Sequence, residues 1–363
     1  MILRPLGRRG IELGFVIYAA CLECSASPPS KGHKMPTSNR LTAIVEDSRP
    51  ICVGRFIIDV PKTANITYGP ARLPVEIVRA EGEAINLDEF VRKAVAKSAE
   101  DKWLARDELV GERSLLGKVI DGVGSDHKIV FGVGRGDSSS YNVQSFIRSG
   151  NDLFIQQYVA FGEGDRYLKA VQDAKEIASH LRHRAANEFP GDSGFCIEGA
   201  FISDPQTYMV EEVTLGIRLK EFDGIHISIG MTKKSKLVES DAIEPRLTAA
   251  ERDAVAQGQG DWYHRILFLR KGRRKIGAWD GFEVAAHMPR QKVAEESHEF
   301  AFLSHGEPKN PLIPMLDVKL HTGISDNMIG GIKPTITDEE ALYLWDKVLS
   351  SIRPRPIPNS ATK

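Results

Sequence analysis

The sequence predicts an α+β protein with two related domains, each a mainly antiparallel sheet with helices packed on one face. A short hydrophobic stretch occurs twice, as Gly-Arg-Phe-Ile-Ile-Asp from Gly54 and as Gly-Ala-Phe-Ile-Ser-Asp from Gly199. A cysteine precedes each copy, Cys52 the first and Cys196 the second. Glycine admits a close backbone, β-branched and aromatic residues favour strands, and Asp and Pro end them. Each copy therefore predicts the opening strand of one domain, and the two flanks share one order of elements.

Length and composition set the broad class. A chain of 363 residues has room for two hydrophobic cores. Hydrophobic residues make up 42% and charged residues 27%, which is typical of a soluble globular protein. The formal net charge of −1 gives no electrostatic reason to expect a nucleic acid as partner.

The first residues have the layout of a bacterial lipoprotein signal. A basic start is followed by an apolar run over 13–20 and by Tyr-Ala-Ala immediately before Cys21. We expect residues 1–20 to be a leader and Cys21 to be the lipidated first residue of the mature chain. Two alternatives stay open, a later translation start and a signal cleaved after the small residues. Residues 21–49 are rich in Ser, Pro, Lys and Asn and predict a flexible tether.

The N-terminal domain is expected over residues 50–188. Its strands are predicted at 51–60, 75–79, 115–120, 128–133, 141–148 and 153–160. A helix should begin at Asn86, with Glu89 completing a capping box, and a longer helix should close the domain over 168–181. The glycine-rich segment 132–136 predicts a hairpin turn.

The Pro- and Gly-containing segment 187–194 predicts a linker, and the C-terminal domain follows over 194–356. Its strands are predicted at 210–219, 224–230, 262–270, 281–287, 299–303 and 316–322. Capping boxes are expected at Thr248 with Glu251 and at Thr337 with Glu340. Prolines stop the last helix, and residues 357–363 form a tail.

Cys52 and Cys196 are the two cysteines of the globular body. A disulfide needs their Cα atoms within about 7 Å, which a sequence does not show. A bridge and a pair of buried thiols therefore both stay open.

No catalytic constellation is apparent. The sequence lacks a Gly-x-Ser-x-Gly elbow and a phosphate-binding Gly-rich loop with Lys-Ser/Thr. His180 and His183 lie one helical turn apart without a Cys or carboxylate cluster, so we expect the exposed side of a helix. Other histidines in strand-like contexts have no spaced ligand partner: His226, His264, His287 and His298. We therefore predict no catalytic residue, no metal ligand and no cofactor.

The basic runs 233–236 and 270–275 lack interleaved aromatics and are expected to be solvated loops.

Three stretches carry a family resemblance: the Cys-Val-Gly-Arg-Phe-Ile-Ile-Asp-Val-Pro run over 52–61, the Gly-Phe-Cys-Ile-Glu-Gly opening over 194–199, and the Leu-Trp-Asp-Lys-Val-Leu-Ser-Ser-Ile-Arg-Pro-Arg-Pro close over 344–356. With them the chain resembles the type VI secretion immunity proteins cognate to Tle-type lipase effectors, fourth subfamily. The resemblance covers roughly residues 50–356, that is, both the N-terminal and the C-terminal family domains.

The resemblance implies a non-enzymatic inhibitor that binds a secreted phospholipase effector in the periplasm and grips it between two domains. It identifies no partner-binding residue. Phe189, Trp262 and Trp279 are candidate anchors, although ordinary core or strand aromatics are the commoner outcome. The alternative function is a structural or scaffold envelope lipoprotein without a toxin partner. A hydrolase of unfamiliar type is a third interpretation, which the missing active-site constellation disfavours.

Overall fold

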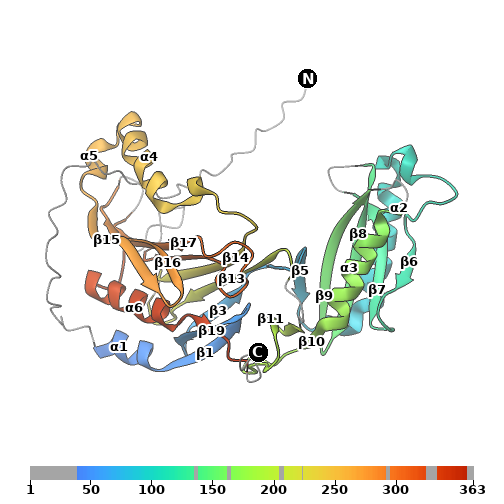
Figure 1. Ribbon diagram of the computed structural model, residues 1–363, viewed down its shortest axis with the longest axis horizontal. Coiled ribbons are helices and arrows are strands. Elements are labelled where there is room, and N and C mark those ends of the chain that lie inside the picture. Colours follow the sequence, from blue (N-terminus) through green and yellow to red (C-terminus); the bar gives the residue numbers. More distant parts are fainter. Residues whose placement is uncertain are drawn as a thin grey trace.

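The computed structural model describes residues 39–134, 138–161, 165–203, 208–222, 224–291, 295–323 and 333–357. Two lobes of unequal size lie side by side and are joined near the middle of the molecule (Figure 1). The small lobe uses one continuous stretch of chain, whereas the large lobe contains both the first and the last described elements. Strand pairings among the described residues are all antiparallel, so the predicted α+β class with mainly antiparallel sheets is confirmed.

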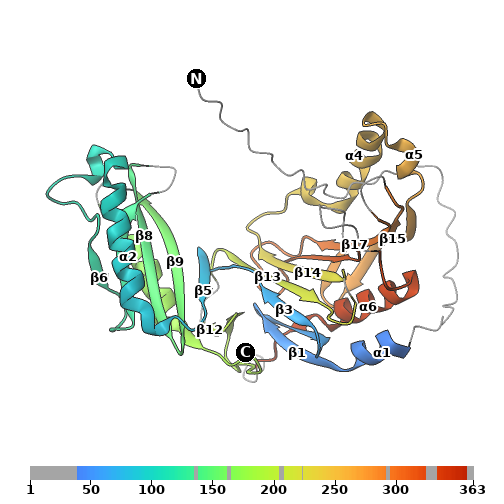
Figure 2. The ribbon, with the colours of Figure 1, turned by 180° about the vertical axis from the view of Figure 1, so that it is seen from behind.

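The small lobe is a twisted sheet between two helices. Its elements are β5 (Glu76–Ala80), η1 (Ala84–Asn86), α2 (Leu87–Glu100), η2 (Asp101–Leu104), η3 (Asp107–Leu109), β6 (Val119–Asp121), β7 (His127–Val133), β8 (Ser140–Ser149), β9 (Asp152–Phe161) and α3 (Tyr167–His180). The strand order is β5-β9-β8-β7-β6. One core, with Leu87 and Phe146, lies under α2, and a second, with Tyr158 and Ala174, lies under α3. The two helices therefore cover opposite faces of the sheet, as the two opposed views show (Figures 1 and 2).

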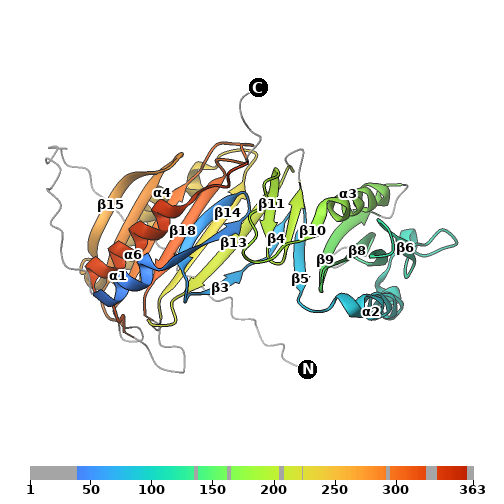
Figure 3. The same ribbon diagram turned by 90° about the horizontal axis from the view of Figure 1, so that it is seen from below.

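The large lobe begins with α1 (Asn39–Glu46), β1 (Ser48–Val53), β2 (Phe56–Pro61), β3 (Asn65–Tyr68) and β4 (Ala71–Arg72). It continues after the small lobe with β13 (Glu211–Arg218), β14 (His226–Lys233), η4 (Glu239–Asp241), α4 (Ile243–Ala256), α5 (Gly260–Tyr263), β15 (Leu267–Ile276), β16 (Trp279–Met288), β17 (Ser297–Ser304), β18 (Met315–His321), α6 (Asp338–Ser351) and β19 (Arg353–Pro354). Its sheet order is β15-β16-β17-β18-β14-β13. Figure 3 shows α6 and α1 lying along one face of this sheet.

Helices cover both faces of the large lobe as well. The core under α6 includes Phe300 and Trp345, whereas α4 and α5 pack with Val284 and Ala286 on the opposite face. The expectation of helices on one face only was therefore wrong. Strand β16 shows why both faces need a cover, because Val284 and Ala286 lie in the core under α4 whereas Ala285 between them lies in the core under α6.

One sheet of 13 described strands runs through both lobes, because β13 pairs with β4, β4 with β5, and β5 with β9. A second connection is the small sheet β10-β12-β11, built from β10 (Leu181–His183), β11 (Gly194–Ile197) and β12 (Ala200–Ser203). The segment between β10 and β11 has no helix or strand, in agreement with the linker predicted there.

The division of the chain in space differs from the division predicted along the sequence. Residues 50–72, assigned to the N-terminal domain over 50–188, pack in the large lobe with the domain over 194–356. The flexible tether was wrong for residues 39–49, which form α1 and the start of β1, because Leu41 and Val45 bury an apolar side against the core around α6. The leader over 1–20, Cys21 and the tail beyond Ile357 lie outside the described residues. No helix in the described part of the chain is long and apolar enough to span a bilayer.

Only one of the three predicted capping boxes forms. Thr337 and Glu340 cap α6 as expected. Asn86 precedes α2 without a side-chain cap; its side-chain amide donates to Glu83 at 2.7 Å, and Glu89 pairs with Arg92 on the next turn. Helix α4 begins at Ile243, so Thr248 lies inside it. Capping signatures recur within helices, and packing of the apolar side decides where a helix begins.

Candidate functional site

The two copies of the repeated stretch form two hairpins that meet where the lobes join. Each copy supplies the turn glycine and second strand of its hairpin, β1-β2 in one case and β11-β12 in the other. The amide of Gly54 donates to the carbonyl of Cys196 at 2.8 Å, and the amide of Cys196 donates back at 2.8 Å. Gly54 has a φ of 55°, and a Cβ there would lie 3.0 Å from Val213. The glycine therefore permits the close backbone approach that the sequence predicted.

A disulfide joins the same two hairpins. Cys52 and Cys196 are bonded, with Cα atoms 5.8 Å apart, and both are fully buried beside Phe201. The bridge closes a loop with a sequence separation of 144 residues. Of the two alternatives that the sequence left open, the structure has the disulfide.

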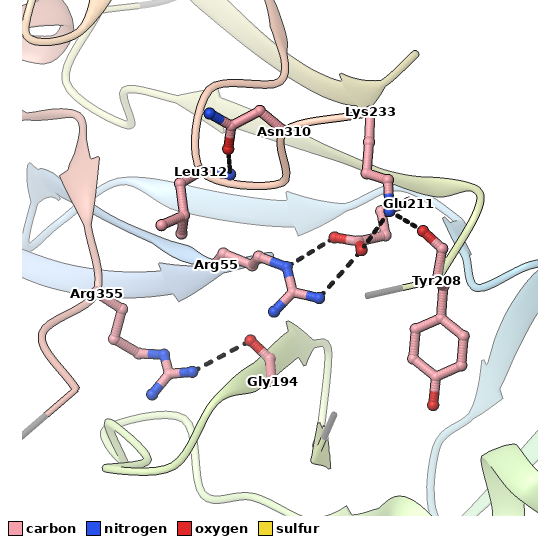
Figure 4. A network of polar contacts seen from close by, with 8 residues as sticks. All are labelled: Arg55, Gly194, Tyr208, Glu211, Lys233, Asn310, Leu312 and Arg355. Atoms are coloured by element: carbon pink, nitrogen blue, oxygen red, sulfur yellow. Dashed lines mark hydrogen bonds and ion pairs between the residues drawn. The ribbon is translucent and has the colours of Figure 1, made fainter. Parts of the chain in front are cut away.

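A buried charge cluster lies next to the hairpins (Figure 4). Arg55, in the β1-β2 turn, donates twice to the carboxylate of Glu211 on β13, at 2.7 and 3.0 Å. Lys233, at the end of β14, lies 3.3 Å from the same carboxylate and also donates to the carbonyl of Tyr208. All three charged side chains are at most 7% exposed. A buried carboxylate shared by two cations keeps its charge only with such partners, so this cluster fixes the turn against the main sheet.

Arg355 closes the joint from the C-terminal side. Its guanidinium donates to the carbonyls of Pro190 and Gly194, and its backbone amide donates to the carbonyl of Arg55 at 2.9 Å. Burial lowers the pKa of this guanidinium, yet an arginine stays charged at neutral pH. The chain beyond α6 is thereby attached to the linker between the predicted domains.

A second polar group connects the small lobe to the β11-β12 hairpin. Arg79 on β5 donates to Asp152 on β9 at 2.7 Å and lies 3.3 Å from Glu198 in the hairpin turn. Asp152 also accepts from the amide of Gly82 at 2.9 Å. Burial acts to raise the pKa of Asp152, but these hydrogen bonds outweigh it and hold the pKa below its usual value. A Cβ on Gly199 would come within 2.8 Å of both Arg79 and Asp152, so glycine is required there.

We refer to this assembly of the two hairpins, the disulfide and the two polar groups as the joint. It brings no nucleophile together with a general base, and its charged groups bind one another. What the joint can do is fix the position of one lobe relative to the other, since it combines covalent, ionic and backbone links.

The predicted histidine sites have mixed outcomes. His180 ends α3 and His183 lies exposed on β10, so the two are not on one helix. His226 stacks on His321 with ring centroids 6.5 Å apart, and the exposed His264 pairs with one carboxylate, that of Glu251, at 3.0 Å.

Two other histidines lie beside a carboxylate that their spacing in the sequence did not indicate. His287 and His298 lie opposite each other on β16 and β17, and both contact Asp338 at the start of α6. Asp338 is 40 or more residues away along the chain, so sequence spacing could not reveal the cluster. The burial of Asp338 acts to raise its pKa, but the hydrogen bonds from the two histidines lower it overall.

The basic runs have mixed outcomes. Residues 234–236 lie outside any helix or strand, with Ser235 and Lys236 exposed, as expected of a solvated loop. Lys233 instead belongs to the buried charge cluster, and the run 270–275 lies within β15, an edge strand of the large sheet. Arg270 pairs with Asp346 of α6 at 2.7 and 2.8 Å, and Arg274 pairs with the same carboxylate at 2.9 Å. Strand alternation places the intervening residues outward, where positive charge discourages another strand from pairing with the edge.

Two of the three candidate anchor aromatics are structural. Trp279 is 1% exposed and donates to the carbonyl of Pro314, and Trp262 packs in the core under α4. Phe189 is partly exposed beside the joint. The sequence analysis missed Trp103, which is 80% exposed in η2 at the end of the small lobe. An exposed Trp is uncommon on a surface without a partner, so Trp103 is the stronger candidate for a partner contact.

Comparison with known proteins finds one matching family domain and several solved structures with a similar fold. Residues 188–357 match the model of the Tle cognate immunity protein 4 C-terminal domain. The match covers 170 of the 363 residues. The immunity domain thus contains the linker, the β11-β12 hairpin, the large sheet and α6, and the resemblance drawn from the sequence is confirmed.

Solved immunity proteins share the fold over most of the chain. The crystal structure of a Tle4-Tli4 complex matches with a TM-score of 0.69 and 22% identity, covering 86% of this chain and 98% of the other. The apo structure of the immunity protein TplEi of the type VI secretion system of Pseudomonas aeruginosa matches with a TM-score of 0.66 and 22% identity, covering 85% and 98%. The same protein in complex with an "L" peptide matches with a TM-score of 0.64 and 22% identity, covering 85% and 98%. A search of curated sequences finds no significant match.

Proposed function

We propose that the protein is an immunity protein that binds a cognate type VI secretion phospholipase effector and blocks its access to lipid, with the effector held between the two lobes. The observation that carries the proposal is the immunity domain over residues 188–357, together with a fold shared along 86% of the chain with the Tli4 structure. The family and the structural neighbours are immunity proteins, which inhibit without catalysis, so the chain is not an enzyme.

The joint supports this function physically. An inhibitor that binds through two lobes gains affinity when the lobes are already placed as in the complex, because less conformational entropy is lost on binding. The disulfide, the Arg55–Glu211–Lys233 cluster and the Arg79 contacts hold that placement.

The periplasm is the compartment that fits the proposal. Disulfides persist in oxidising compartments, and the bridge between Cys52 and Cys196 lies in the core of the joint. The leader and the lipidation of Cys21 belong to the same proposal, which rests for them on the sequence pattern.

Co-purification tests the function directly. The chain from residue 21 onward is expressed with a candidate type VI secretion lipase, the complex is isolated, and phospholipase activity is measured on vesicles with and without the protein. We expect a stable complex and loss of lipase activity. A matched variant, Trp103→Ala, should fold normally and inhibit less well. If no complex forms and the lipase stays fully active, the result would instead favour an envelope scaffold protein without a toxin partner.

A further inference from the structure

A group of three metal-ligand side chains lies far from the joint, at the opposite end of α6. His287 on β16, His298 on β17 and Asp338, the first residue of α6, place their ligand atoms within 4.8 Å of one another. His287 Nδ1 lies 2.8 Å from Asp338 Oδ1, and His298 Nε2 lies 2.8 Å from the same oxygen. Two imidazoles and one carboxylate therefore converge on one point.

We propose that His287, His298 and Asp338 form a binding site for a divalent transition metal ion, with Zn²⁺ the best-suited occupant. Two imidazole nitrogens and one carboxylate oxygen are a common set of three protein ligands for zinc, which accepts a fourth ligand from water or another molecule. With metal–ligand distances of about 2.0 to 2.2 Å, neighbouring ligand atoms of a tetrahedral site lie roughly 3.3 Å apart. Each 2.8 Å contact between a histidine and Asp338 would therefore lengthen by about half an ångström.

The position of the three groups fits entry of an ion. His298 is 2% exposed, whereas His287 and Asp338 are 30% and 29% exposed. One ligand is thus fixed in the core, and two face solvent and can adjust. Asp338 belongs to the first turn of a helix, where a small rotation of the side chain does not disturb the sheet.

A supporting hydrogen bond orients the buried ligand. Thr322 Oγ1 lies 2.8 Å from His298 Nδ1 and accepts from the backbone amide of His298 at 2.8 Å. A hydroxyl can donate to a ring nitrogen or accept from it. When Nδ1–H donates to Thr322, Nε2 of His298 carries the lone pair that a metal requires, and such a partner is the usual second contact of a metal-bound histidine.

Charges at the start of α6 act on a bound cation in opposite directions. The N-terminus of α6 carries partial positive charge, which disfavours a cation. Three carboxylates in the first turn, Asp338, Glu339 and Glu340, oppose that charge, and Glu296 acts on His298 from the strand side. Lys333 lies 3.9 Å from Glu296 and offsets part of this charge.

Zinc titration of the full chain, purified without a polyhistidine tag and treated with a chelator, tests the site. We expect calorimetry to show one Zn²⁺ per chain with a dissociation constant in the micromolar range or below, and a thermal midpoint that rises with excess zinc. Co²⁺ added in place of zinc should show the visible absorption of a four-coordinate ion. Three side chains that only hydrogen-bond to one another, without binding the ion, would not produce it.

Variants separate this site from incidental histidine binding. His287→Ala changes a partly exposed ligand and Asp338→Asn keeps an oxygen without the charge, so both should fold and lower zinc affinity at least 30-fold. The matched control is His264→Ala, which removes an exposed histidine paired with a single carboxylate and should leave binding unchanged. The proposal is overturned if the wild-type chain binds no zinc, or if His287→Ala binds it as tightly as the wild type.

Discussion

The small and the large lobe are built from the chain in opposite ways. The small lobe is a single run from β5 to α3, and β6, β7 and β8 each pair with the next strand along the chain, whereas β5 reaches across to β9. The large lobe is closed by elements from both ends: β19 pairs with β2, Arg353 pairs with Asp59, and Arg355 bonds to Arg55. Closing such long loops costs chain entropy, so the large lobe depends more on its cross-links than the small lobe does.

Removal of the disulfide is the strongest test of that difference. A Cys52→Ser and Cys196→Ser double variant loses a link with a sequence separation of 144. The chain-entropy model predicts a loss of about 4 to 5 kcal/mol in the free energy of unfolding for a loop of this size. Hydrogen exchange should show the loss in β13 and β14 and much less in β8 and β9.

Reduction of the wild-type protein should reproduce the effect, and reductant should not change the double variant. Equal loss of protection in both lobes would show that the molecule unfolds as one unit and that the lobes do not differ in this respect.

Substitution of the buried carboxylate is the next largest change. Glu211→Ala leaves Arg55 and Lys233 buried without their anion, which is expected to cost about 3 to 5 kcal/mol. The matched control is Glu212→Ala, one residue along the same strand, where the partner Arg72 is 53% exposed and 3.4 Å away. That pair should contribute less than about 1 kcal/mol. Urea unfolding of both variants measures the contrast, and similar losses would contradict a special role for the cluster.

Strands were predicted about equally well in both lobes, since β13 and β18 of the large lobe also agree with their predicted ranges to within one residue at each end. What differs is the prediction of elements whose partners lie far along the chain. In the small lobe, alternation and glycine turns predicted β7, β8 and β9 to within one residue at each end, because the relevant partners are neighbours in the chain. In the large lobe, residues 39–49 looked like a tether because their few apolar residues are buried only by packing with α6, about 300 residues later in the chain.

The joint and the histidine cluster were beyond sequence analysis for the same reason. The repeat of Gly54 and Gly199 indicated two related strands, but not that the two hairpins bond to each other. Arg55 and Glu211 are 156 residues apart, and His298 and Asp338 are 40 apart. Nothing in the local pattern of a charged residue shows which distant group it will meet once the chain folds.

Acidification should destabilise the small lobe through His127. This side chain is 1% exposed, accepts from the amide of Val123 at Nδ1 and contacts Ser145 at Nε2, so it is held neutral. Burial, with a contribution from Lys175, lowers its pKa to about 4. Between that value and about 6.5 the unfolded chain binds more protons than the folded one, so stability falls as the pH falls.

Between pH 7 and pH 5, protonation of His127 should lower the free energy of unfolding by about 2 kcal/mol. Urea unfolding at both pH values measures this difference. His127→Phe should reduce this pH dependence, whereas His183→Gln, at an exposed histidine on β10, should leave it unchanged. An unaltered pH dependence in His127→Phe would place the effect in the large lobe, where burial also lowers the pKa of His321 to about 4.

Substitution at the exposed end of the small lobe tests whether that lobe contacts the effector, with an exposed residue of the large lobe as control. Trp103 in the small lobe is 80% exposed and Val255 on α4 of the large lobe is 57% exposed, so neither change should affect folding. If the effector is held between the lobes through the end of the small one, Trp103→Ala should weaken binding by about 1 to 2 kcal/mol, roughly 5- to 30-fold. Val255→Ala should change it by less than about 0.5 kcal/mol, because a small aliphatic side chain seldom dominates an interface. If Trp103→Ala leaves the affinity unchanged, the effector does not contact the small lobe at η2, and the strands nearer the joint become the candidate contact.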